Sequence, residues 1–104
     1  MDEELERCLA DARVCADACE AYLGGLPEGS AELRDAVDAL AAPAAVARTL
    51  DELADQPRPL ALAAARLLHE LAAGAVDRVD GRSELADALR AVADSTARLL
   101  ATAE

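Results

Sequence analysis

Apolar residues recur through most of the chain at alternating intervals of three and four, which is the spacing of one face of a helix. From about Glu3 to Leu23 this spacing marks one continuous face, and the charged residues fall on the opposite side. The apolar residues of that face are Leu5, Cys8, Leu9, Ala12, Cys15, Ala16, Cys19, Tyr22 and Leu23. Gly24 and Gly25, followed by Pro27, are typical of a helix end. The pattern predicts a first helix that turns all three cysteines inward.

A second helix is predicted to begin after Ser30, a natural N-cap, with Glu32 in its first turn, where the helix dipole favours negative charge. Its expected core stripe consists of Leu33, Val37, Leu40, Ala44, Ala47 and Leu50. Pro43 interrupts this stripe and removes one backbone hydrogen bond. Because the apolar phase is kept across the proline, we expect a kink near Ala39 to Pro43 rather than a break.

The segment from Asp55 to Pro59 contains two prolines and is the predicted linker to a third helix, from about Pro59 to Val79. Only a narrow side of that helix is polar. A helix this apolar is expected either at the centre of the fold or covered by a second subunit, which predicts a homo-oligomer through this helix. Ser83 is then expected to cap a fourth helix that ends near Thr102. The inward residues of that helix are Leu85, Leu89, Val92, Thr96 and Leu99.

Composition narrows the fold to one class. The chain has 104 residues and only 1% aromatic residues, so its core is built from Ala, Leu and Val. Ala and Leu favour helix, and residues that favour strands are sparse. Four helices with three short connections predict an all-α, antiparallel up-down-up-down four-helix bundle formed by one domain over residues 1–104.

The net charge is −11, from 21 acidic residues and 10 basic ones, all arginine. A field of that sign repels nucleic acid and anionic lipid, so neither is an expected partner. No run reaches the roughly 18 to 20 uninterrupted apolar residues of a membrane span, and Met1 is followed by acidic residues rather than by a signal peptide. These features predict a cytoplasmic protein, and the absence of lysine favours a GC-rich bacterial genome.

The cysteines carry the most distinctive chemistry. Cys8, Cys15 and Cys19 occupy three positions of a series spaced by 4, 3 and 4, with Ala12 at the remaining position. Side chains four residues apart on a helix lie about 5 to 6 Å apart at Cβ, so Cys15 and Cys19 can share one soft ion such as Cu(I). Cys8 is expected to assist only through a neighbouring ion or a partner chain.

His69 is the single imidazole of the chain and the only candidate nitrogen ligand. The third helix can be aligned with the 4, 3, 4 series so that His69 takes a cysteine-equivalent position. The thiol face of the first helix has no basic residue, so the sequence predicts nothing that lowers a thiol pKa before metal binds.

The Cys15-Ala-Asp-Ala-Cys19 segment, together with the 4, 3, 4 spacing in every helix, resembles the cysteine-rich four-helix-bundle copper-storage proteins. The resemblance in layout runs from about Leu5 to Leu100. It implies Cys-x-x-x-Cys pairs that point into the bundle and hold Cu(I) there. The cysteine motif itself matches only in the first helix. At the other thiol positions of that family this chain has Ala, Leu or Val, which implies a small Cu(I) load.

Alternative interpretations of these residues remain open at this point. Free cysteine packs like a small hydrophobic residue, so all three can be structural core residues. Redox exchange is a third possibility, although a disulfide between Cys15 and Cys19 within one helix is strained and the cytosol keeps thiols reduced. His69 can equally be an edge or interface residue, and Tyr22 a plug at the end of the core with its hydroxyl in water.

Catalysis finds little support in the sequence. The chain has no glycine-rich phosphate loop, no Glu-x-x-His pair of the di-iron bundle type and no Ser, His and Asp grouping, so an enzyme is not expected. Two hypotheses follow. The first is a low-capacity Cu(I)-binding bundle that uses the thiolates of the first helix. The second is a metal-free helical module that acts by oligomerisation or by binding a partner.

Overall fold

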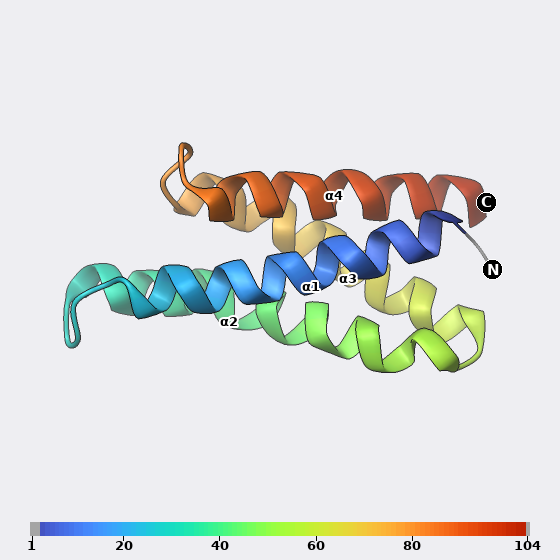
Figure 1. The fold of residues 1–104 in the computed structure, drawn as a ribbon, viewed down its shortest axis with the longest axis horizontal. Helices are drawn as coiled ribbons and strands as arrows, with labels where there is room; N and C mark the ends of the chain where they lie inside the picture. The colour runs from blue at the N-terminus through green and yellow to red at the C-terminus, as the bar shows by residue number, and fades with distance from the viewer. Residues whose placement is uncertain (1–2, 104) are drawn as a thin grey trace.

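The computed structural model describes residues 3–103 and confirms the all-α bundle. Its helices are α1 (Glu3–Gly24), α2 (Ala31–Glu52), α3 (Arg58–Ala75) and α4 (Glu84–Ala103), with short 3-10 turns η1 (Leu53–Asp55) and η2 (Val76–Arg78). The chain runs back and forth along the long axis, so successive helices are antiparallel and the start of α1 lies at the same end of the bundle as the end of α4 (Figure 1). No strand occurs among the described residues.

The helices pack in a ring, α1 on α2, α2 on α3, α3 on α4 and α4 back on α1. The described part of the bundle measures 42 × 22 × 17 Å. Alanine is the commonest residue in its core, which lets helix backbones approach closely. The inward residues expected on α4 are all buried, as are the cysteines and alanines expected inward on α1. For these two helices the hydrophobic period therefore predicts the correct face.

Serine caps begin two of the helices, as predicted. The Ser30 hydroxyl accepts a hydrogen bond of 3.0 Å from the Leu33 amide at the start of α2. The Ser83 hydroxyl accepts one of 3.1 Å from the Ala86 amide at the start of α4. Gly29, just before the first of these caps, has a φ of 73°, a left-handed conformation that favours glycine. The caps and this turn fix where the chain reverses.

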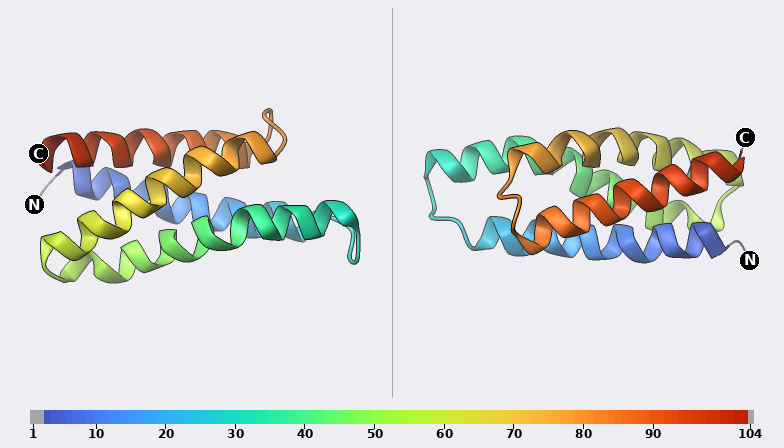
Figure 2. Two further views of the ribbon diagram at one scale, coloured as in Figure 1. Left: turned by 180° about the vertical axis from the view of Figure 1, so that it is seen from behind. Right: turned by 90° about the horizontal axis from the view of Figure 1, so that it is seen from above.

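Helix α2 continues through Pro43, which is itself buried, and its axis changes direction near the middle (Figure 2). The predicted stripe keeps Leu40, Ala47 and Leu50, which are buried, but is wrong at Val37, which is 44% exposed. Ala36 and Ala39 are buried in its place. These alanines sit beside the predicted face and are equally apolar, and their small side chains allow closer approach of the neighbouring helix. Before the proline the buried face therefore consists of Ala36, Ala39 and Leu40 rather than Val37 and Leu40.

Helix α3 is the most apolar helix and yet lies partly outside the core. It crosses diagonally from the end of α2 to the start of α4, and its second half lies beside Ala39 and Pro43 of α2 (Figure 2). By length and composition alone, the stretch Arg58–Arg78 is long and apolar enough to cross a membrane, a criterion that core helices of other proteins also meet. Only 28% of its most apolar window is buried, so the bundle does not enclose this helix.

Candidate metal site

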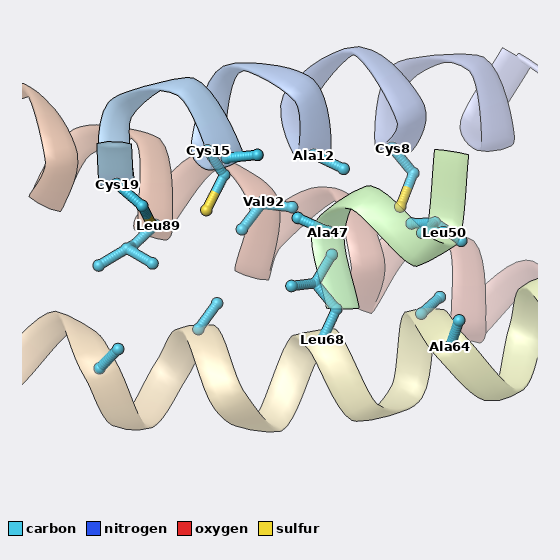
Figure 3. Close-up of a cluster of buried hydrophobic side chains, with 14 of the residues drawn as sticks. Cys8, Ala12, Cys15, Cys19, Ala47, Leu50, Ala64, Leu68, Leu89 and Val92 are labelled. Atoms are coloured by element: carbon cyan, nitrogen blue, oxygen red, sulfur yellow. The ribbon is translucent and has the colours of Figure 1, made fainter. Parts of the chain in front are cut away.

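All three cysteines are free thiols with no exposed surface, and they sit on one side of the unbroken helix α1. Figure 3 shows their side chains directed into the space between the helices, as the 4, 3, 4 spacing predicts. Cys15 and Cys19 lie near Val92 and Leu89 of α4, whereas Cys8 lies beyond Ala12, toward Leu50 of α2. The sulfur atoms therefore form one adjacent pair and one separate thiol.

The pair is linked by a side-chain hydrogen bond in which the Cys15 S–H donates to the Cys19 sulfur. This bond raises the pKa of Cys15, and burial raises it further. The same bond lowers the pKa of Cys19, against the opposing effects of burial and of the Glu20 charge. One thiolate at Cys19, stabilised by the proton on Cys15, is thus the favoured first ionisation of the pair.

Cys8 has a different environment. Burial, with a smaller contribution from the Asp11 carboxylate, raises the pKa of Cys8 from about 9.0 to about 12. Asp11 in turn accepts a hydrogen bond from the Ser95 hydroxyl, which links α1 to α4 beside this thiol. A thiol with so high a pKa stays protonated at neutral pH, and no second thiol lies one helical turn from Cys8.

A basic residue does act on the thiol pair, which corrects the prediction that none would. The guanidinium of Arg48 on α2 lowers the pKa of Cys19. Arg48 is held by an ion pair with Glu20 and by a longer contact of 3.8 Å with Asp17, both on α1. Inspection of α1 alone could not find it, because this charge comes from the neighbouring helix.

Arg48 also lines an open pocket of about 400 Å³ between α1 and α2. The lining includes Ala16 and Ala47, which belong to the buried core, and a second arginine, Arg13, which pairs with Asp51 at 2.6 Å. The pocket therefore brings solvent to the alanine layer immediately beside the sulfur pair.

His69 lies elsewhere, half-buried at the contact between α3 and α4. Its Nδ1 is 2.9 Å from the Ala93 carbonyl oxygen and 3.2 Å from the Thr96 hydroxyl. It borders a separate groove of about 380 Å³ on that side of the bundle. Among residues 3–103, no three His, Cys, Asp or Glu side chains come together in a group suited to a metal ion, so His69 does not join the two cysteines.

The donor set of the pair limits which metal it fits. Two sulfur atoms with no third ligand suit a soft monovalent ion of low coordination number, for which Cu(I) is the biological example. Structural Zn(II) requires four ligands in a tetrahedron, and the described residues do not supply them. If an ion binds here, Cys15 and Cys19 would hold it.

No family model, no curated protein and no solved structure matches this chain. The resemblance to copper-storage proteins accordingly rests on the sequence alone, on the cysteine motif of α1 and the spacing of apolar residues in the helices.

Proposed function

We propose that this chain is a low-capacity Cu(I)-binding bundle in which Cys15 and Cys19 are the two ligands. The observation that carries the proposal is a pair of free thiols, one helical turn apart and without exposed surface, inside a helical bundle. Soft sulfur ligands and exclusion of water both favour Cu(I), and neither favours a hard cation. The resemblance to the copper-storage proteins supports the same ion.

Binding of one Cu(I) converts two thiols into two thiolates and releases the two protons of Cys15 and Cys19. Because the ligands must be deprotonated, affinity rises with pH. The lowered pKa of Cys19 reduces the cost of the first deprotonation, and the Arg48 guanidinium acts in the same direction. The complex carries one net negative charge, which the Arg48 guanidinium favours and the Glu20 carboxylate beside it opposes. Arg48 is a positioning residue in this proposal and touches no metal.

The proposal places the chain in a reducing compartment such as the cytoplasm, since free thiols persist there. It assigns no catalytic step to the chain. One ion per chain matches the single sulfur pair, and the buried Ala, Leu and Val side chains of α2, α3 and α4 offer no further soft ligand. The role is therefore to hold or hand over a single copper ion rather than to store many.

An anaerobic titration with Cu(I) in competition with a chromogenic chelator tests the proposal. The reduced protein is expected to withdraw one Cu(I) per chain from the chelator. Cys15→Ala and Cys19→Ala are each expected to abolish this withdrawal. Cys8→Ala is the matched control, because it removes a buried thiol from the same helix face and leaves the pair intact.

Two results would contradict the proposal. Wild-type protein that withdraws less than one Cu(I) per chain would mean that the cysteines only fill the core. Equal loss of binding in all three variants would mean that the pair is not the site. Circular dichroism of each variant establishes that the bundle still folds, so that lost binding reflects a lost ligand.

A further inference from the structure

The exposed side of α3 presents a line of large and small apolar residues that the other described elements leave mostly uncovered, although Leu71 is half-buried. The line consists of Leu60, Ala63, Leu67, Leu71 and Gly74, spaced by 3, 4, 4 and 3 on one helical face. Four large apolar side chains are exposed among residues 3–103, and two of them, Leu60 at 48% and Leu67 at 47%, lie on this line. The other two are isolated on α1 and α2.

The order of large and small residues along this line is self-complementary. In an antiparallel pair of α3 helices centred on Leu67, residues equally far before and after the centre meet. Leu60 of one copy then meets Gly74 of the other, and Ala63 meets Leu71. Each large side chain faces a small one, and Leu67 packs on Leu67 of the second copy at the two-fold axis.

Gly74 supports this arrangement independently. Glycine is unfavourable inside a helix, and nothing within the chain requires it here, because an added Cβ would meet no other element within 4 Å. Beside it runs a shallow groove of about 250 Å³ between α2 and α3, lined in part by Ala42, Leu71 and Gly74. This groove has room for a leucine side chain from outside.

The charges on α3 fit a second copy of the same chain. Arg66 and Glu70 lie one turn apart on the same flank of the line, and neither forms an ion pair within residues 3–103. Corresponding flanks face each other in an antiparallel pair, so Arg66 of each copy comes within reach of Glu70 of the other. Among the helices, α3 alone has more basic than acidic residues, so contact there keeps the acidic faces of two highly charged chains apart.

From these observations we propose that α3 is a homodimer interface, an isologous antiparallel contact centred on Leu67. The occupant of the exposed face is a second copy of this chain, with Leu60 seated over Gly74 and two symmetric pairs between Arg66 and Glu70. The interface lies on a different side of the bundle from the sulfur pair and does not depend on metal.

Sedimentation equilibrium over a range of concentrations tests the proposal on the full chain. Wild type is expected to show a reversible monomer to dimer transition. Leu67→Glu is expected to raise the dissociation constant at least about 100-fold, because each buried leucine contributes about tenfold or more and the symmetric dimer loses two. Val14→Glu is the matched control, because it places the same charge on the exposed face of α1. It is expected to leave the dissociation constant unchanged.

Two further variants test the geometry rather than the face alone. Gly74→Leu, which has open space within the chain, is expected to keep the helical fold and lose the dimer. Arg66→Glu is expected to weaken the dimer, and adding Glu70→Arg in the same chain is expected to restore it, because the pairs then reform with reversed sign. A parallel contact would place like residues opposite each other and show no such rescue.

A protein that stays monomeric at every concentration would overturn the proposal, as would a dimer unaffected by Leu67→Glu. Flotation with phospholipid vesicles is measured alongside. Vesicle binding by a monomer that Leu67→Glu abolishes would assign the exposed face to a lipid surface and would likewise overturn the dimer.

Discussion

Helices α1 and α3 differ in how far hydropathy predicts burial. α1 is only moderately apolar, yet its three cysteines, with Ala12 and Ala16 between them, have almost no exposed surface. α3 is the most apolar helix of the bundle, yet Leu60 and Leu67 are nearly half exposed. The comparison shows that burial depends on which faces the neighbouring helices cover, and that the total hydropathy of a helix does not decide it.

Substitution of two adjacent leucines on α3 tests this contrast and is expected to give the largest change in the free energy of unfolding. Leu68 has no exposed surface, so Leu68→Ala is expected to lower the free energy of unfolding by about 2 to 5 kcal/mol. Leu67→Ala, on the exposed line, is expected to change it by about 0.5 kcal/mol or less in the monomer. Urea denaturation at a concentration where the protein is monomeric measures both. Similar losses at the two positions would show that the faces of α3 are wrongly assigned.

Alkaline pH tests the buried side of α1. The pKa of Cys8 is raised to about 12, so above about pH 9 the folded chain keeps a proton on Cys8 that the unfolded chain has lost. The contribution of the Cys8 thiol to the free energy of unfolding is therefore fully present below pH 9, and it is lost as the pH rises toward 12. Between pH 8 and pH 10, wild type is expected to lose up to about 1.4 kcal/mol more than Cys8→Ala.

Urea denaturation at the two pH values measures that difference. The comparison between the two proteins cancels the titration of groups that they share. Equal pH dependence in wild type and Cys8→Ala would mean that Cys8 is not buried as described.

The smallest expected effect concerns the charge next to the sulfur pair. Arg48→Gln removes the guanidinium that lowers the pKa of Cys19, so the first thiolate of the pair is expected to form at a higher pH than in wild type. The shift is small because Arg48 is half exposed and its field is screened by solvent. Ultraviolet absorbance of the thiolate, followed against pH, measures it. Arg13→Gln is the control, since Arg13 lines the same pocket and pairs with Asp51.

The sequence predicts this molecule well where one face of a helix is chemically distinct. The serine caps at Ser30 and Ser83, the inward face of α1 and the core stripe of α4 all follow from local pattern. It fails at Val37, because an alanine-rich helix offers two adjacent faces of equal hydropathy and only tertiary packing selects between them. The kink expected at Pro43 follows from the backbone chemistry of proline and agrees with the bend of α2.

The features of the candidate site also divide into those that the sequence predicts and those that it does not. The pairing of Cys15 and Cys19 follows from spacing within one helix. The contribution of Arg48 and the placement of His69 depend on contacts between helices, which a single sequence does not encode locally. In the sequence, Arg48 is a basic residue of the second helix that could pair with the acidic side of the first. That pairing can be assigned only once the two helices are known to be neighbours.

X-ray absorption spectroscopy of the protein loaded with one Cu(I) tests the central claim most directly, because it identifies the ligand atoms. The account predicts two sulfur neighbours and no nitrogen neighbour in wild type, an unchanged spectrum in Cys8→Ala, and no bound copper in Cys15→Ala. A nitrogen neighbour, or copper retained with the same sulfur shell after loss of Cys15, would contradict it.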